Sequence, residues 1–121
     1  MNRIKVMVNG LPGNATQMIA RHIARDDTMT LLPYSLTGPE IEIDQITIED
    51  QDIALIAPDQ RDTAIMAIKD ANSPFISLDF THPSAVNRNA RFYCTHGLPF
   101  VMGTTGGDRQ QLLETVTKSS I

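Results

Sequence analysis

The chain contains 121 residues but only one cysteine, Cys94, and no tryptophan. A single cysteine excludes a disulfide framework within the chain. The cysteine and the three histidines also show no metal-ligand spacing. We therefore expect a protein of a reducing compartment that has no metal site.

Long apolar runs are missing as well. No stretch approaches the roughly 20 apolar residues that a membrane-spanning helix needs, and the start of the chain has no signal-peptide pattern. We therefore expect a cytoplasmic protein with no membrane partner.

Positive charge is absent from one region of a chain whose net charge is -4. Residues 40–59 hold no Lys or Arg. The acidic residues in this region are Glu40, Glu42, Asp44, Glu49, Asp50, Asp52 and Asp59. Because nucleic acids are bound through basic surfaces, this distribution argues against nucleic acid as a partner and favours a solvated acidic edge.

Residues 4–23 organise the rest of the chain. The apolar run at residues 4–8 has the length of a buried strand, and Gly10 and Gly13 follow it directly. The apolar spacing then changes to that of a helix, with one face formed by Ala15, Met18, Ile19, His22 and Ile23. A strand, a glycine turn and a helix begin a nucleotide-binding α/β sheet, in which the N–H groups of the helix start face a phosphate. Judged from this stretch alone, a glycine pair that forms only a turn and binds no nucleotide is an equally good interpretation.

The remaining pattern extends this unit. We expect strands at residues 29–35, 53–57, 75–80 and 99–102, and helices at 58–71, at 83–96 and after 109. Residues 41–48 alternate in polarity, which predicts a bent strand or a strand pair inserted on the surface. Short right-handed crossovers then give a single Rossmann-like α/β domain over residues 1–121, with a doubly wound parallel sheet of order 3-2-1-4-5.

Polar loops follow several of the predicted strands at the edge where open α/β sheets bind ligands. Phe80 ends one strand and Thr81 follows it, and the glycine-rich residues 103–109 follow another. After the second strand, Ser35 and Thr37 offer hydroxyl groups for a nucleotide, although such hydroxyls often only cap turns. Residues 35–38 hold neither an acid nor a base, so the choice between NADH and NADPH stays open.

Residues of reactive types are assigned structural roles. We expect His22 to be buried and hydrogen-bonded on the helix stripe, and Cys94 to pack in the core. His82 and His96 have no paired acid or nucleophile in view. Asp79 is expected to accept hydrogen bonds from loop N–H groups rather than to act as a general base. The sequence therefore predicts no catalytic residue.

Two runs carry a family resemblance. The run DFTHP at residues 79–83 and the run GLPFVMGTTGGDR at residues 97–109 resemble the cofactor domain of the 4-hydroxy-tetrahydrodipicolinate reductase (dihydrodipicolinate reductase) family of lysine and diaminopimelate biosynthesis. The runs VMVNG at residues 6–10 and PSAVN at 83–87 are most similar to the plant-type branch of that family, which adds a plastid as an expected location. The resemblance covers nearly the whole chain.

The resemblance implies a bound NADPH or NADH and assigns residues to it. The pyrophosphate loop is implied at Gly10, Leu11, Pro12, Gly13, Asn14, Ala15 and Thr16. Phe80 and Thr81 match the loop beside the nicotinamide ribose, and the nicotinamide ring is implied at Gly103, Thr104, Thr105 and Gly106. Asn14 stands where the family usually has a basic residue and Thr16 where it has a glycine, which weakens a 2′-phosphate contact and predicts a crowded turn.

The resemblance also implies a second domain with a His-rich, Lys-containing catalytic motif, which the printed sequence does not contain. We therefore expect a truncated, cofactor-binding part of a reductase that has no turnover by itself. Two alternatives are a free-standing nucleotide-binding or regulatory module without catalysis, and a different nucleotide-binding enzyme on the same fold. Without the missing domain, we expect self-association near Met102.

Overall fold

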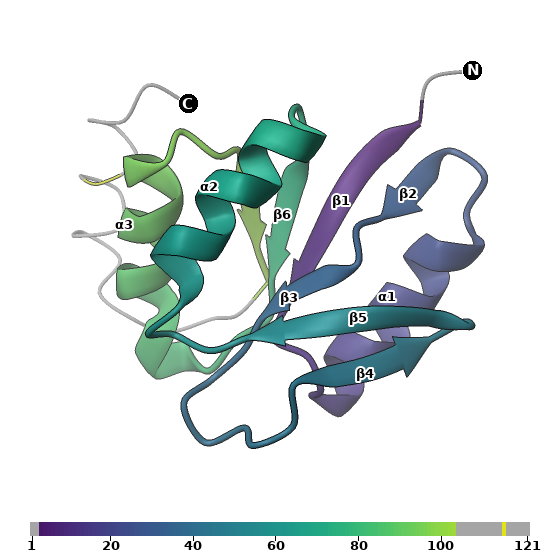
Figure 1. Ribbon diagram of the computed structural model, residues 1–121, viewed down its shortest axis with the longest axis horizontal. Coiled ribbons are helices and arrows are strands. Elements are labelled where there is room, and N and C mark those ends of the chain that lie inside the picture. The colour runs from purple at the N-terminus through teal and green to yellow at the C-terminus, as the bar shows by residue number, and fades with distance from the viewer. Residues whose placement is uncertain (1–2, 104–114, 116–121) are drawn as a thin grey trace.

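The computed structural model describes residues 3–103 and 115 of the chain (Figure 1). In chain order, the elements are β1 (Ile4–Asn9), α1 (Asn14–Arg25), β2 (Met29–Leu31), β3 (Tyr34–Leu36), β4 (Gln45–Ile48), β5 (Gln51–Ile56), α2 (Arg61–Asn72), β6 (Ile76–Asp79), the 3₁₀ turn η1 (Pro83–Ala85), α3 (Val86–Thr95) and β7 (Phe100–Met102). The predicted helix after residue 109 lies outside the described residues.

The strands form two hydrogen-bonded sheets. One is fully parallel with the order β2-β1-β6-β7, and the other has the order β3-β5-β4, in which β3 and β5 are parallel. The strand predicted at residues 29–35 is divided into β2 and β3 at Pro33, which has no N–H group to donate. With β2 and β3 taken as one interrupted strand, the order β5-(β3/β2)-β1-β6-β7 is the predicted 3-2-1-4-5. The α/β Rossmann-like fold is therefore confirmed.

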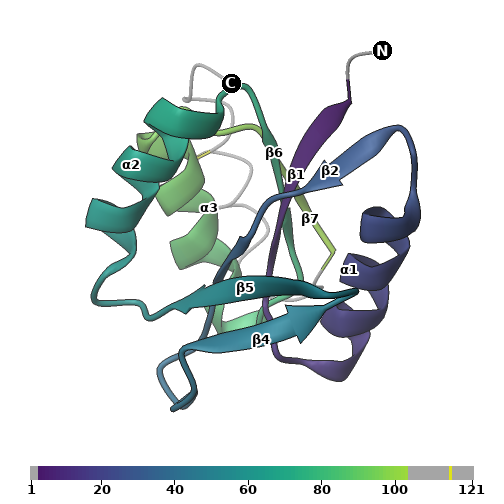
Figure 2. The same ribbon diagram turned by 45° about the vertical axis from the view of Figure 1, so that its right-hand side comes forward.

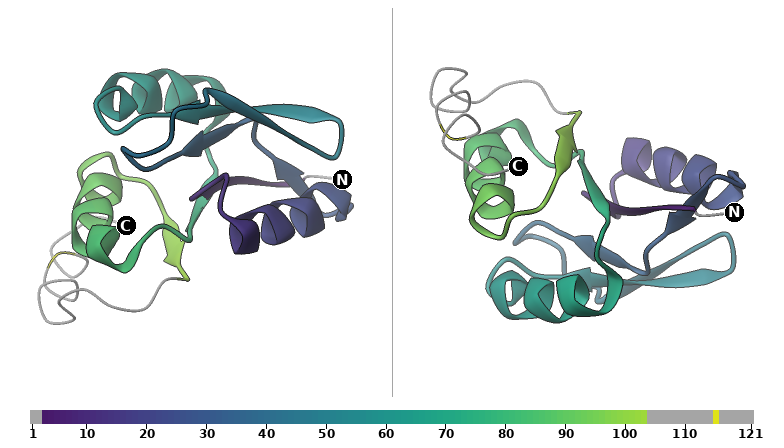
Figure 3. Two further views of the ribbon diagram at one scale, coloured as in Figure 1. Left: turned by 90° about the horizontal axis from the view of Figure 1, so that it is seen from below. Right: turned by 90° about the horizontal axis from the view of Figure 1, so that it is seen from above.

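Helices cover both faces of β1 and β6 (Figure 2). On one face, Val6 and Val8 pack with Ala20 and Ile23 of α1. On the other face, Met7 belongs to the core that α2 and α3 cover; its members include Ile65, Ile68, Phe92 and Tyr93. Figure 3 shows α1 apart from α2 and α3 when the molecule is viewed from either end. The alternation along β1 thus builds one core on each side.

The predicted inner face of α1 is right for Ile23, which is buried, and for Ile19, which packs against the core, but wrong for Ala15, Met18 and His22, which are exposed. The buried residues are Thr16, Ala20 and Ile23. His22 is exposed and Met18 is 60% exposed, so His22 is not the buried histidine that the spacing predicts. Small side chains at positions 16 and 20 allow the helix to lie close to β1, and this packing outweighs the larger apolar side chain of Met18.

The two helices on the other face are found with shifted starts. Residues 58–60 form a turn in which the Gln60 N–H donates to the Ala57 carbonyl oxygen at 3.0 Å, so α2 begins at Arg61 rather than at residue 58. Val86, Ala90 and Tyr93 of α3 are buried as predicted, while Cys94 is only half-buried.

The segment predicted as a surface insertion is an antiparallel edge strand. Strand β4 pairs with β5 through a two-residue turn at Glu49 and Asp50. Ile48 is 1% exposed and packs in the core that contains Val6 and Ile23, on the side of the sheet that α1 covers. Strand β4 therefore contributes to that core as well as to the surface. At the opposite side, β7 is the last strand of its sheet among the described residues and Val101 is 56% exposed. Self-association there stays a prediction.

We expect Asp50→Gly to stabilise the protein by about 1 kcal/mol, because Asp50 has φ of 65° in the turn and left-handed backbone costs a residue with a side chain about 1–2 kcal/mol. Urea denaturation measures the change in the free energy of unfolding. The matched control is Asp52→Gly within β5, which should destabilise the protein by up to about 1 kcal/mol. Destabilisation by Asp50→Gly would contradict the turn geometry.

Candidate functional site

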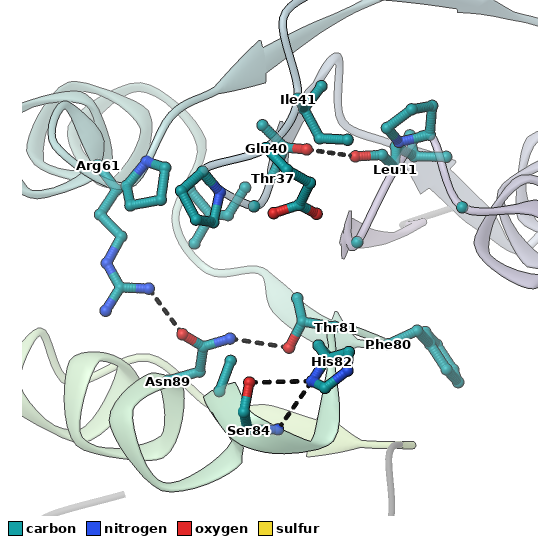
Figure 4. Close-up of a pocket in the computed structure, with 18 of the residues that line it drawn as sticks. Leu11, Thr37, Glu40, Ile41, Arg61, Phe80, Thr81, His82, Ser84 and Asn89 are labelled. Carbon is teal, nitrogen blue, oxygen red and sulfur yellow. Dashed lines mark hydrogen bonds between the residues drawn. The ribbon is translucent and has the colours of Figure 1, made fainter.

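A cavity of about 760 Å³ opens at the carboxyl ends of β1, β3 and β6 (Figure 4). Three segments and two further residues form its walls: residues 10–14 after β1, residues 36–41 after β3, residues 80–82, 84, 85, 88 and 89 after β6, together with Pro58 and Arg61. This is the edge where open α/β sheets bind ligands.

Gly10 forms the turn that leaves β1. Its φ is +115°, and a Cβ atom at this position would lie 2.8 Å from the carbonyl oxygen of Phe80. Its N–H group donates to the Leu36 carbonyl oxygen at 3.0 Å. Any side chain here would therefore separate the turn from the loop after β6, so this position requires glycine.

Thr16 lies beneath this turn rather than in the cavity. It is 2% exposed, and its Oγ1 is 3.1 Å from the position that a Gly10 Cβ would occupy. Thr16 does not line the cavity. The side chain therefore fills the space below the turn, on the side away from any ligand.

The start of α1 is suited to an anion. Gly13 precedes the helix, no side-chain hydrogen bond caps this end, and the first turn holds no acidic residue. Gly13 and Asn14 both line the cavity. Because the first N–H groups of a helix have no carbonyl partner within it and carry its positive dipole end, they can bind a phosphate group.

The loop after β3 is tied to the glycine turn. The Thr37 hydroxyl donates to the Leu11 carbonyl oxygen at 2.7 Å, and the Leu11 N–H donates to Ser35 Oγ at 3.3 Å. Ser35 is fully buried and lies outside the lining, whereas Thr37 is 8% exposed and lines the cavity. Both hydroxyl groups thus hold the loop in place.

Glu40 is a lining residue that the sequence analysis missed. Figure 4 shows its side chain pointing into the cavity from the loop after β3. A Cβ on Gly38 would lie 2.6 Å from Glu40 Oε1, so glycine at position 38 lets this carboxylate fold back over the loop. Glu40 lies two positions beyond residues 35–38, the segment that the sequence predicts to face the adenosine ribose.

A buried hydrogen-bond network centred on Asp79 lies under the cavity. The Asp79 carboxylate is 0% exposed. It accepts hydrogen bonds from the Tyr93 hydroxyl at 2.6 Å, from Asn89 Nδ2 at 3.1 Å, and from the N–H and hydroxyl of Thr81 at 3.0 and 2.6 Å. Asn9 Nδ2 donates to the Tyr93 hydroxyl at 2.8 Å. The expected hydrogen bond from a loop N–H group to Asp79 is therefore confirmed, and side-chain donors add to it.

Two guanidinium groups line the same cavity. Arg61 is the first residue of α2, and its Nη1 donates to Asn89 Oδ1 at 2.7 Å. Its guanidinium carbon lies 4.3 Å from the centre of the Phe92 ring. Arg88 extends from α3 and is exposed. Sequence reasoning singled out neither residue, because each is a lone arginine on a helix.

The structure brings most of the predicted site residues together. Those that line the cavity are Gly10, Leu11, Pro12, Gly13, Asn14, Thr37, Phe80 and Thr81. Those described but outside the lining are Ala15, Thr16, Ser35 and Gly103. The Gly103 N–H donates to the Asp79 carbonyl oxygen at 2.8 Å, and a Cβ there would overlap the Phe80 ring. Thr104, Thr105 and Gly106 lie outside the described residues.

Two histidines flank the helical segment after β6: His82 precedes η1 and His96 directly follows α3. His82 lines the cavity, and its Nδ1 lies 2.9 Å from Ser84 Oγ. His96 Nε2 lies 3.2 Å from Asp62 Oδ1 on the surface, so the expectation that His96 has no paired acid is wrong. Over residues 3–103 and 115, no group of three His, Cys, Asp or Glu side chains is placed to hold a metal ion. No helix in that part of the chain is long and apolar enough to cross a membrane.

We expect Tyr93→Phe to destabilise the protein by about 1.5–3 kcal/mol at neutral pH, because the Asp79 carboxylate loses a donor and Asn9 loses an acceptor. Burial, followed by the negative charge of Asp79, raises the pKa of Tyr93 well above its ordinary value. The folded state therefore keeps this proton at pH values where the unfolded chain releases it.

The stability of the wild type should consequently fall above about pH 10, by up to about 1.4 kcal/mol per pH unit more than that of the Tyr93→Phe variant. Urea denaturation of both proteins from about pH 8 to about pH 11 measures this difference. Parallel pH profiles would contradict the buried phenol.

Comparisons with known proteins place the chain in a family. The family model described as "Dihydrodipicolinate reductase, N-terminus" matches residues 4–120. The chain is 34% identical over 120 residues to "4-hydroxy-tetrahydrodipicolinate reductase 1, chloroplastic" of Arabidopsis thaliana, which covers 99% of this chain and 34% of that protein. It is 32% identical over 116 residues to a 4-hydroxy-tetrahydrodipicolinate reductase of Enterococcus faecalis, covering 92% of this chain and 40% of that protein.

A solved structure shares the fold. It is a dipicolinate-bound dihydrodipicolinate reductase from a Paenisporosarcina species, with a TM-score of 0.67 and 22% sequence identity, covering 95% of this chain and 42% of that one. The chain spans about a third of the length of the curated plant relatives that it matches.

Proposed function

The chain belongs to the family of dihydrodipicolinate reductase N-terminal domains, and we propose that its cavity binds NADH or NADPH for a reductase of lysine biosynthesis. The observation that carries the proposal is the uncapped start of α1, which opens with a required glycine turn onto a cavity of about 760 Å³. When bound, the dinucleotide supplies the hydride for reduction of a substrate.

The residues of the chain bind and orient this cofactor. The N–H groups at the start of α1 hold the pyrophosphate, as in other sheets of this type. Glu40, on the loop after β3, accepts hydrogen bonds from sugar hydroxyl groups. Phe80 and Thr81 form the wall on the side of β6, and the Asp79 network fixes Thr81 through its N–H group and its hydroxyl group.

In this proposal, residues outside 1–121 bind the substrate and transfer the proton. The curated plant relatives are about three times as long as the matched region. We propose that a segment of the kind that fills the rest of those relatives holds the substrate, and that residues 1–121 bind the cofactor without turnover by themselves. Several of these relatives are named chloroplastic, and a plastid or cytoplasmic location of this chain stays a proposal.

A free-standing binding module without catalysis is the second candidate. Asn14, which lines the cavity where the resemblance implies a basic residue, favours it. Thr16 favours it less, because the side chain lies beneath the turn. Adding a relative's C-terminal segment separates the two candidates, since activity on 4-hydroxy-tetrahydrodipicolinate supports only the reductase. Family membership argues against an unrelated enzyme on the same fold.

We expect Gly13→Asp to weaken the binding of NADH and NADPH at least tenfold. A Cβ at position 13 would lie 3.1 Å from the Gly10 carbonyl oxygen, so any side chain there causes the same small displacement of the turn. Gly13 has φ of -52° and ψ of 144°, which suits a capping residue, so aspartate would cap α1 but place a negative charge where the pyrophosphate binds. Calorimetric titration with each dinucleotide measures the loss.

Gly13→Asn is the matched control, because asparagine caps equally well, has nearly the same size and carries no charge. It should retain more of the affinity than Gly13→Asp. Equal binding by the two variants would show that the start of α1 does not hold an anion. A wild-type chain that binds neither dinucleotide would refute the proposed function itself.

A further inference from the structure

Arg61 and Arg88 place two positive charges on the wall of one cavity. Within the described part of the chain, the ion pairs are Arg25 with Glu49 and His96 with Asp62, so neither of these two arginines is paired with an acid there. Glu40 is the one carboxylate among the described lining residues. The charged groups of the lining therefore sum to a positive charge.

Arg61 is held rigidly in this position. Its Nη1 donates to Asn89 Oδ1 at 2.7 Å, and its guanidinium stacks over the Phe92 ring at 4.3 Å. Asn89 is itself fixed by hydrogen bonds to Asp79 and Thr81. Because a guanidinium has five N–H donors, the bond to Asn89 leaves donors for a ligand in the cavity that Arg61 lines. Figure 4 shows this side chain reaching across from α2 toward α3.

The two arginines also repel each other. Burial, followed by the positive charge of Arg88, lowers the pKa of Arg61 from its ordinary value. Both groups stay charged, because a guanidinium is not deprotonated in proteins. An anion bound between them would remove this repulsion, and guanidinium groups suit the oxygens of a phosphate group. A purely structural role would require only Arg61, through Phe92 and Asn89, and would not require Arg88.

The position of the pair distinguishes it from the pyrophosphate site. The start of α1 lies after β1, whereas Arg61 follows β5 and Arg88 follows β6. Residues 36–41 and Pro58 complete the wall on the side of β3 and β5, where a dinucleotide places its adenosine half. A phosphate group carried by the adenosine would therefore meet this part of the wall.

We propose that Arg61 and Arg88 form a second phosphate-binding site in the cavity, which accepts a phosphate monoester group such as the 2′-phosphate that NADPH has and NADH lacks. This inference rests on the proposed function. The phosphate could equally arrive as a free ion, and the experiment separates the two sources.

The experiment titrates the full chain with NADH, with NADPH and with inorganic phosphate. The variants are Arg61→Met, which keeps an unbranched side chain over Phe92, and Arg88→Gln, together with the double variant. Arg91→Gln is the control, because Arg91 is exposed on the same helix as Arg88 and does not line the cavity. Thermal unfolding checks that each variant is folded. If Arg61→Met does not fold, Arg88→Gln carries the test, because Arg88 is exposed.

We expect the wild type to bind NADPH more tightly than NADH, because the two positive charges of Arg61 and Arg88 outweigh the single negative charge of Glu40 in the same lining. Each single variant should weaken NADPH binding roughly tenfold, since a hydrogen bond to a charged group contributes about a factor of ten in affinity. The same variant should change NADH binding by less than about twofold, because NADH has no 2′-phosphate. Arg91→Gln should change neither. Inorganic phosphate should compete more strongly with NADPH than with NADH, because only NADPH also occupies the arginine pair, and this difference should disappear in the double variant.

Several outcomes would overturn the inference. If the wild type binds NADH but not NADPH, the arginine site is refuted and the proposed function stands. The same holds if the arginine variants lose affinity for NADH and NADPH equally. If neither dinucleotide binds, the proposed function fails, and the direct phosphate titration decides alone. Phosphate binding that is lost in the double variant then supports a site for free phosphate, and absent phosphate binding overturns the site.

Discussion

A carboxylate with no exposed surface is the constraint on which this structure depends. Burying an ionised group is costly unless hydrogen bonds satisfy it, and Asp79 receives donors from Tyr93, Asn89 and Thr81. The chain of bonds continues from Tyr93 to Asn9 Nδ2, and Asn9 Oδ1 accepts from the Leu36 N–H at 2.8 Å. The carboxyl ends of β6, β1 and β3 are thereby held together by side chains as well as by the sheet.

These fixed strand ends determine where the loops that line the cavity lie. Because β1 and β6 end at the same level, the Gly10 turn comes close to the Phe80 carbonyl, and α1 begins at the rim of the cavity. The network also reaches the opposite wall, where Asn89 holds the Arg61 guanidinium. The same buried polar groups therefore position the start of α1, the loop after β6 and the arginine pair with respect to one another. Each of these is a place where a dinucleotide would be held.

Much of this fold could be predicted because its signals are local. Apolar runs gave the parallel strands, and a change of apolar spacing after Gly10 and Gly13 gave α1. The glycine turn and its neighbours accordingly lie where the sequence placed them. The face of α1 was mispredicted at His22, because close packing through Thr16 and Ala20 is a property of the helix against β1 and not of the helix alone.

The polar part of the site could not be read from local patterns. Asn9 and Tyr93 are 84 residues apart, and no periodicity links a polar residue at the end of one strand to a tyrosine on a distant helix. A usable signal did exist, since Asn9 and Asp79 each end an apolar strand and parallel neighbours bring such ends together. Arg61 and Glu40 carried no comparable signal, because only the folded structure brings the start of α2 and the loop after β3 to the cavity.

Amide chemical shifts recorded during a titration of the full chain with NADH test the central claim most directly. The account predicts that the largest changes fall on Gly10, Gly13, Asn14, Phe80 and Thr81, where the start of α1 and the loop after β6 meet. Changes concentrated instead on the outer groove between α2 and α3, around Lys69 and Gly97, would contradict it.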